Sequence, residues 1–355
     1  MLYSSSVLAQ SSPPNRVTIQ MGGAVQSATP AQGKVVTTLA SKARGALLDG
    51  PQGITTDGVH LYLVDPINNT ISKIAIATGV LTRIAGSLAT QAWGYIDGPG
   101  SVANFKRPQG ITTDGTNLYI ADTFNHVIRK MVIATGVVST LSGRWNTAGA
   151  VGSDDGPPKD ASFSSPRGIT TDGTFLYVAD TGNHTVRKIT ITTGAVTTLA
   201  GSPGSIGSAD GIGAAARFDS LTGITTDGTN VYVADTKNNA IRKIVIATGQ
   251  VTTLAGQAGT FGSDDGIATR ARFTGPHGVV TDGTNVFVAD TFSQTIRKIV
   301  IATGVVTTIA GIPGVTGKVD GLGRNATFSR PSNLTNDGTY LYVSDLHNSA
   351  VRIVE

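Results

Sequence analysis

The 355-residue chain has no cysteine and one glutamate, Glu355, at its last position. The lack of cysteine excludes disulfides, zinc–thiolate sites and cysteine nucleophiles. With one glutamate, the paired carboxylates of glycosidase chemistry would have to be aspartates. No apolar run approaches the roughly 20 residues that a membrane-spanning helix needs, so we expect no membrane span.

Charge is also sparse, because only 14% of the residues are Asp, Glu, Lys or Arg and the formal net charge is +4. So small a basic excess over so long a chain is not typical of a dedicated nucleic-acid binder. Phosphate-binding loops, dinucleotide fingerprints and Gly-x-Ser-x-Gly elbows do not occur. We therefore expect no cofactor, and nucleic acid is not the expected partner.

What the chain does contain is a repeated unit of about 55 residues, clearest from Gly168 to Gly201. Within it, four runs rich in β-branched residues are separated by Gly or Asx turns and predict four strands: 168–172, 176–180, 186–191 and 195–200. The aspartate of the first turn recurs at intervals of 57, 58, 55, 55 and 55 residues, as Asp57, Asp114, Asp172, Asp227, Asp282 and Asp337. Six such units predict an all-β fold, a six-bladed β-propeller with four-stranded blades.

The two ends of the repeat region complement each other. The sixth copy stops after its third strand, at 352–355. Residues 33–40 match the fourth strand of the fifth copy, 304–310, almost residue for residue. We therefore expect the N-terminal strand to complete the sixth blade and close the ring without an open edge.

The repeat motifs resemble those of the NHL-repeat family. They are Tyr-Val-Ala-Asp-Thr-Gly-Asn-His at 177–184, Val-Arg-Lys-Ile at 186–189, and the Pro-x-Gly-Ile pattern at 108–111. The resemblance covers about residues 33–355 and implies a six-bladed propeller. It does not imply one function, because the family includes protein-binding, RNA-binding and enzymatic members.

Residues 1–32 differ from the repeats, and we expect them to form a flexible N-terminal segment. Val7-Leu8-Ala9, followed by Gln10, resembles the end of a signal peptide. The apolar stretch before it is short and no basic residue precedes it, so a start codon assigned too late and an accidental match remain alternatives. On this basis we expect a secreted, cell-surface or periplasmic protein, with the propeller at 33–355.

Repetition also assigns most of the polar residues to structure. In five copies the aspartate that ends the second strand is followed seven residues later by arginine, which predicts an Asp–Arg pair or loop-bracing hydrogen bonds around the ring; the first copy has Ser72 in place of the arginine. The loops between copies repeat Asp-Gly and then Ala-x-Phe, and the aromatic is expected to fill the gap between blades.

No catalytic residue or metal site is predicted. The five histidines do not cluster by spacing, and we interpret them as loop-bracing or solvated; a zinc site, as in NHL-type amidating lyases, would need three of them to converge. Asn333 and Asn336 distinguish the first strand of the sixth copy. Two asparagines without a partnering acid make a weak calcium site.

Departures from the repeat are the candidate binding residues. They fall on the face where the long blade-crossing loops meet the loops between second and third strands. The candidates are Trp93, Tyr95, Trp145, Phe124, Phe292, Arg272 and Arg330. Other basic residues expected on this face are Lys106, Arg107, Arg167 and Arg217. Exposed aromatics beside arginine are typical contact anchors, although the two tryptophans could instead fold back onto their own loops.

The sequence thus favours a non-enzymatic binding propeller that contacts a protein or carbohydrate partner, or another copy of itself, through its long-loop face. One alternative is a propeller hydrolase or lyase with a site at the channel mouth. The other is RNA binding, against which the interspersed Asp97, Asp155, Asp210 and Asp265 argue.

Overall fold

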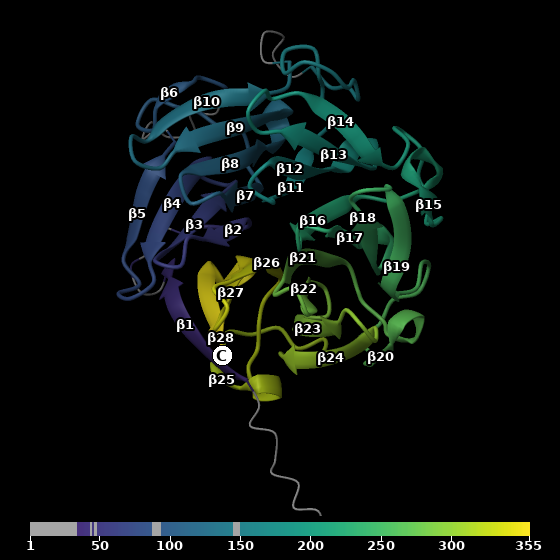
Figure 1. Cartoon of the computed structure of the whole chain (residues 1–355). Coiled ribbons are helices and arrows are strands. Elements are labelled where there is room, and N and C mark those ends of the chain that lie inside the picture. The colour runs from purple at the N-terminus through teal and green to yellow at the C-terminus, as the bar shows by residue number, and fades with distance from the viewer. Residues whose placement is uncertain (1–33, 43–44, 46–47, 87–93, 145–149) are drawn as a thin grey trace, which may run out of the picture. The chain divides into compact units, whose positions relative to one another are not determined.

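The computed structural model describes residues 34–42, 45, 48–86, 94–144 and 150–355, which belong to one compact unit, Gly33–Glu355. These residues form six antiparallel sheets arranged around a central axis (Figure 1). In each sheet the first strand lies nearest the axis and contacts the first strands of both neighbouring blades. The predicted six-bladed propeller is confirmed.

The strand bounds follow the repeat closely. Blade one comprises β2 (Ile54–Thr56), β3 (His60–Asp65), β4 (Thr70–Ala75) and β5 (Leu81–Ala85). Blade two comprises β7 (Gly110–Thr113), β8 (Asn117–Asp122), β9 (Val127–Val132) and β10 (Val137–Ser142). Blade three comprises β11 (Pro166–Thr171), β12 (Phe175–Asp180), β13 (Thr185–Thr190) and β14 (Val196–Ala200).

The second half of the ring repeats this order. Blade four comprises β16 (Leu221–Thr226), β17 (Asn230–Asp235), β18 (Ala240–Val245) and β19 (Gln250–Gly256). Blade five comprises β21 (Pro276–Thr281), β22 (Asn285–Asp290), β23 (Thr295–Val300) and β24 (Val305–Ala310). Blade six comprises β26 (Pro331–Asn336), β27 (Leu341–Asp345), β28 (Ala350–Val354) and β1 (Val35–Ser41).

The ring is closed as the sequence predicted. β1 lies antiparallel to β28, with Val36 opposite Val354 and Thr38 opposite Arg352. The seam is also held by side chains, because Asp320 accepts hydrogen bonds from both the backbone N–H and the hydroxyl of Thr38. The N-terminal strand therefore supplies the outer strand of the last blade, and the two ends of the repeat region meet within one sheet.

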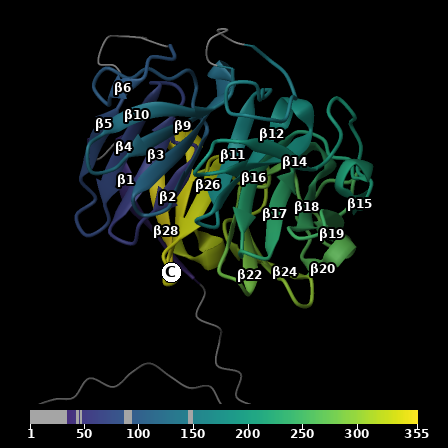
Figure 2. The same cartoon turned by 45° about the horizontal axis from the view of Figure 1, so that its top comes forward.

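Four blades carry a fifth strand that the sequence analysis did not anticipate. These two-residue strands are β6 (Gly98–Pro99), β15 (Gly211–Ile212), β20 (Gly266–Ile267) and β25 (Gly321–Leu322). Each belongs to an Asp-Gly motif of a crossing loop and pairs with the fourth strand of its sheet. Figure 2 shows β6, β15 and β20 at the outer edge of the ring. They cover edges that would otherwise expose unpaired backbone groups.

The helical elements found among the described residues are single 3-10 turns. Four lie between the second and third strands of their blades: η2 (Thr123–Asn125), η3 (Thr181–Asn183), η5 (Thr236–Asn238) and η8 (Leu346–Asn348). Three lie in crossing loops: η4 (Gly213–Ala215), η6 (Ala268–Arg270) and η7 (Gly323–Asn325). Within the described ranges, no helix has the length and apolar character to cross a membrane.

The core is divided into six hydrophobic clusters, each of which joins two neighbouring blades. Between blades three and four, Tyr177 and Val186 pack with Val231, and Phe218 of the crossing loop completes the cluster. The equivalent loop residues Phe105, Phe163, Phe273, Phe328 and Leu48 are buried in the other five clusters, as the sequence predicted. Each blade thus depends on both neighbours to bury its two faces.

Candidate functional site

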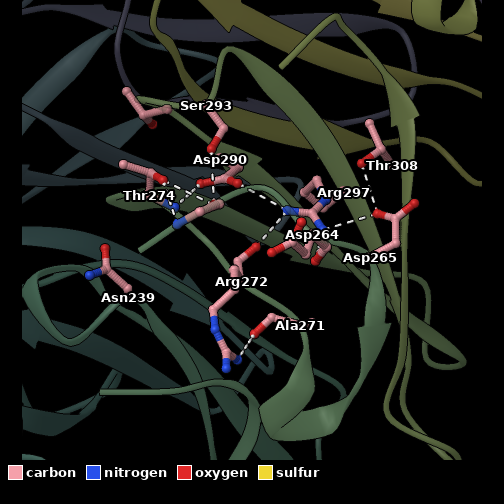
Figure 3. Close-up of polar contacts among 12 residues, drawn as sticks. Asn239, Asp264, Asp265, Ala271, Arg272, Thr274, Asp290, Ser293, Arg297 and Thr308 are labelled. Atoms are coloured by element: carbon pink, nitrogen blue, oxygen red, sulfur yellow. Dashed lines mark hydrogen bonds and ion pairs between the residues drawn. The ribbon is translucent and has the colours of Figure 1, made fainter. Parts of the chain in front are cut away.

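Many of the aspartates belong to an arrangement that recurs in five blades and is shown for blade five in Figure 3. Arg297 donates from Nη1 to Asp290 Oδ2 (3.1 Å) and from Nη2 to Asp265 Oδ1 (3.0 Å). The same guanidinium binds two loop carbonyls and lies 5.1 Å from the ring centroid of Phe273. We name this arrangement the arginine clamp; its central residues are Arg129, Arg187, Arg242, Arg297 and Arg352.

The clamps confirm the predicted Asp–Arg pair and add the crossing-loop aspartate as a second partner. Burial raises the pKa of Asp235 to about 6 and that of Asp290 to about 7. Blade one has Ser72 in place of the arginine, and there Asp65 accepts hydrogen bonds from Asn68 Nδ2 and the Asp49 N–H, both at 2.9 Å. Because these carboxylates brace loops between packed blades, the clamps are structural.

Two of the histidines also brace loops, as predicted. His126 and His184 lie in the left-handed conformation directly after η2 and η3. Their Nδ1 atoms accept hydrogen bonds from the backbone N–H of Ser165 (2.9 Å) and Ser220 (3.1 Å) in the next blade. Burial lowers the pKa of His126, which keeps the imidazole neutral and able to accept. No set of three His, Cys, Asp or Glu in the described part of the chain converges as metal ligands.

The departures from six-fold repetition converge instead at one mouth of the central channel. A cavity of about 180 Å³ lies there, lined by residues from all six blades. Each blade contributes the residue two positions before its innermost isoleucine, leucine or valine: Gln52, Gln109, Arg167, Thr222, His277 and Ser332. In most blades this is the variable position of the Pro-x-Gly pattern, and five residue types occupy it in the six blades, since glutamine occurs twice. We name this space the axial cavity.

A second cavity, of about 490 Å³, adjoins the first and shares Gln52 and Gln109 with it. Its other walls are Lys106, Arg107 and Phe124 from blade two and the loop Pro66, Ile67 and Asn69 from blade one. We name it the lateral cavity. The two cavities form one depression on the long-loop face, which we name the mouth.

Below the mouth the channel narrows to a ring of small residues. A Cβ atom on Gly110 would lie 1.9 Å from Arg167 O, and one on Gly168 would lie 2.1 Å from Thr222 O. The innermost strands therefore approach too closely for any side chain at these positions. Blade six has Asn333 in this ring, and Asn333 lines both the axial cavity and the narrow channel beneath it.

The mouth is cationic. None of the described residues that line the axial and lateral cavities is Asp or Glu. Arg167 has a buried Nε atom without a hydrogen-bond partner, and burial lowers the pKa of its guanidinium. Arg330 lies with its guanidinium carbon 5.1 Å from the ring centroid of Phe292, and Arg107 lies 5.4 Å from that of Phe124.

Both stacked arginines also have unusual backbones. Arg107 and Arg330 precede a proline and have φ of 47° and 53°, a region that L-residues rarely occupy. Their N–H groups are fixed by Asn69 Oδ1 (2.7 Å) and Gln294 Oε1 (2.6 Å) of the preceding blade. The equivalent residues of blades three, four and five, which are Ser165, Ser220 and Gly275, have the same left-handed backbone, so this conformation belongs to the repeat.

His277 adds a neutral group to the axial cavity. Its ring makes an edge contact with Phe292, with centroids 5.9 Å apart. Burial, together with the charges of Arg167 and Arg330, lowers the pKa of His277 to about 4. At neutral pH the imidazole is therefore uncharged.

The structure brings together three of the seven candidate residues. Phe124, Phe292 and Arg330 line the mouth. Tyr95 is 49% exposed but lines neither cavity, and Arg272 donates to the carbonyls of Thr269 and Ala271 in its own loop. Trp93 and Trp145 lie outside the described residues.

The sequence analysis missed the roles of Gln52, Gln109, Thr222, His277 and Ser332, and it did not single out Arg167 among the basic residues of this face. The signal was the variable residue of the Pro-x-Gly pattern. These variable residues lie about 55 positions apart in the sequence, so the sequence alone does not bring them together. They form one site only when the first strands of the six blades are placed around the axis.

Comparison with known proteins agrees with this architecture. The chain is 26% identical over 337 residues to NHL repeat-containing protein 2 of Bos taurus, covering 86% of this chain and 46% of that protein. It spans less than half the length of the curated relatives it matches. No protein-family model matches the chain.

Two solved structures share the fold. One is a protein of unknown function from Bacteroides thetaiotaomicron VPI-5482, with a TM-score of 0.67 at 20% identity, covering 90% of this chain and 75% of that one. The other is an auxiliary nutrient binding protein from the same organism, with a TM-score of 0.64 at 17% identity, covering 87% and 69%. From its six repeats and its closed ring, the chain is a six-bladed β-propeller, and its sequence relatives are NHL repeat-containing proteins.

Proposed function

We propose that this chain is a non-enzymatic binding propeller that holds a protein or carbohydrate ligand on its long-loop face, centred on the mouth. The observation that carries the proposal is the contrast between two sets of polar residues. The clamp arginines and the second-strand aspartates that they bind are repeated, paired and buried. The six equivalent mouth positions carry five residue types, and Arg107, Arg167 and Arg330 make no ion pair among the described residues.

The mouth also has the form of a ligand site. Such sites are concave and largely pre-formed, with a few convergent polar groups. The solved structure described as an auxiliary nutrient binding protein has the same fold, which makes nutrient capture a reasonable role to test here. We further propose that the protein works outside the cytoplasm, as the segment ending at Ala9 suggested.

The test is a comparison of two arginines on one face. Arg330→Ala changes the mouth, whereas Arg272→Ala is the matched control, since Arg272 lines neither cavity. Both variants and the wild type would be screened on protein extracts and on a glycan array, with thermal melting to check the fold. Loss of a ligand with Arg330→Ala alone supports the proposal. If Arg330→Ala retains every ligand and Arg272→Ala loses one, the contact surface lies on the crossing loops and not at the mouth.

The tryptophan candidates are tested separately. Trp93→Ala/Trp145→Ala should melt like the wild type and lose partner binding or assembly if the two rings serve as contact anchors. Early unfolding of the double variant would mean that the rings are core residues. Normal melting with full binding would leave the mouth as the contact surface.

The second candidate function is a lyase or hydrolase with its site at the mouth. Its support is His277, which is neutral at pH 7 and lies in a cavity beside Arg167 and Arg330. A neutral imidazole can accept a proton, and the guanidinium groups beside it would stabilise the negative charge that forms. His277→Gln separates the two functions: it would abolish turnover by an enzyme, but leave the affinity of a pure binding site within a few-fold.

A further inference from the structure

We propose that the mouth binds an acidic saccharide, with its carboxylate or sulfate group on Arg167 and Arg330 in the axial cavity and its sugar rings in the lateral cavity. The inference rests on the proposed function for the location of the site and adds the chemical class of the ligand. Three features carry it: the unpaired arginines, the free amides between the two cavities, and the shape of the depression.

We infer that the ligand carries an anionic group because Arg167 and Arg330 have no ion-pair partner among the described residues. Arg167 and Arg330 form no ion pair with any described residue, while every clamp arginine binds two aspartates. Arg167 Nε is buried without a partner, as are the Nε atoms of the clamp arginines, so the two sets differ in their ion pairs. Arg330 is held in place by Phe292, so little conformational freedom is lost when it binds. Guanidinium groups arranged in this way match the planar oxygens of a carboxylate or the oxygens of a sulfate.

We infer that the rest of the ligand is a sugar because the neutral side chains that line the two cavities can bind hydroxyl groups. Gln52 and Gln109 line both cavities, and none of the hydrogen bonds found within the described residues uses their side-chain amides. An amide offers two donors and an acceptor, which suits the hydroxyl groups of a sugar ring. The hydroxyls of Thr222 and Ser332 instead bind backbone carbonyls, so they shape the cavity wall. Asn333 Oδ1 accepts from the Leu334 N–H, which leaves its Nδ2 group toward the channel.

Shape and stacking argue against a nucleotide. The axial cavity, at about 180 Å³, suits one oxyanion, and the lateral cavity, at about 490 Å³, has room for sugar rings. Phe124 and Phe292 already have guanidinium groups over their rings, which reduces the surface available to stack a base. Among the described lining residues there is no carboxylate that could bind the divalent cation of a polyphosphate.

Calorimetric titration of the full chain provides the test. The probes are a galacturonic acid trisaccharide, a sulfated disaccharide, a neutral trisaccharide of the same length, free sulfate, and a single-stranded RNA. We expect one acidic saccharide to bind at least about tenfold more tightly than the neutral one, the carboxylated and sulfated probes showing which oxyanion is preferred. Arg167→Gln and Arg330→Gln should each weaken that binding by about tenfold or more, as expected for a lost charge-assisted hydrogen bond, while Arg272→Gln should not.

Two further variants keep the result interpretable. Arg167→Gln removes an unpaired buried charge, so it should melt at the wild-type temperature or above. Gln109→Ala should weaken saccharide binding but not the binding of free sulfate. If the neutral sugar binds as tightly as the acidic ones, and only Gln109→Ala weakens it, the mouth is a binding site but the acidic class is wrong. If no saccharide binds, if the RNA binds more tightly, or if Arg272→Gln is as damaging as Arg330→Gln, the inference is overturned.

Discussion

Replacing Arg297 by methionine would measure how strongly an arginine clamp holds its blade. The change removes two ion pairs and two hydrogen bonds to loop carbonyls, but keeps a side chain that can pack on Phe273. It leaves Asp290 fully buried without its cation. Removal of one partner from a buried pair costs about 3–5 kcal/mol, chiefly because the remaining charge is uncompensated.

The measurement is urea unfolding followed by far-ultraviolet circular dichroism. A loss of about 4 kcal/mol changes the folding equilibrium roughly a thousandfold and should shift the unfolding midpoint clearly. Lys298→Met is the matched control, since it removes the same charge from the next residue of β23, whose side chain has no ion pair in the described structure. Its expected effect is within about 0.5 kcal/mol.

A double variant then tests the physical cause. In Arg297→Met/Asp290→Asn the buried charge is gone, while the amide oxygen can still accept the hydrogen bond from the Thr274 N–H, which is 2.7 Å in the wild type. The double variant should therefore be more stable than Arg297→Met alone. A single variant that costs less than about 1 kcal/mol, or a double variant that is less stable than the single one, would refute the reasoning.

Three other predictions follow from the ring. Deleting residues 1–41 removes β1 and exposes the edge of β28, so melting should fall below that of the 1–32 deletion and aggregation should increase; identical melting of the two deletions would contradict the seam. Gly168→Ala would place Cβ 2.1 Å from Thr222 O and should cost about 3 kcal/mol in urea unfolding, whereas an unchanged midpoint would show that the innermost strands can separate. Because the pKa of His277 is lowered from 6.5 to about 4, the unfolded chain takes up its proton first, and the free energy of unfolding should decrease by at most about 3 kcal/mol as pH falls between these values. His277→Gln should lose that part of the pH dependence, and an unaltered profile would assign it to other groups.

The fold was predictable because every blade must bury its two faces against its neighbours with the same set of contacts. All six copies repeat the turn aspartate, and five of them repeat the clamp pair and the crossing-loop aromatic, so one pattern is read several times over. The closure of the ring could be predicted for the same reason. The sixth copy lacks its fourth strand, and the N-terminal residues 33–40 match the sequence of such a strand. The clamp was predicted only in part: spacing along one blade indicated the Asp290–Arg297 pair, but Asp265 joins it across a loop whose path the spacing did not define.

The mouth could not be found in this way, because its residues have no pattern along the chain. Gln109 and His277 are unremarkable one at a time, and they become neighbours only around the axis. The left-handed backbone of Arg107 and Arg330 was not predicted either, since the equivalent residues of the other blades are glycine or serine and arginine gives no local indication of φ. Departures from the repeat did indicate the face on which the mouth lies, through Phe124 and Phe292.

The seam between β1 and β28 has a consequence for biosynthesis. β1 leaves the ribosome about 300 residues before its partner, which at about 5–20 residues per second is an interval of roughly 15–60 s. Throughout that time the nascent chain can hold only an open arc of blades, and Val36, fully buried in the finished ring, has no β28 against which to pack. The time spent as an arc is therefore set by translation and not by the folding rate of any blade, and it ends only when β28 has emerged.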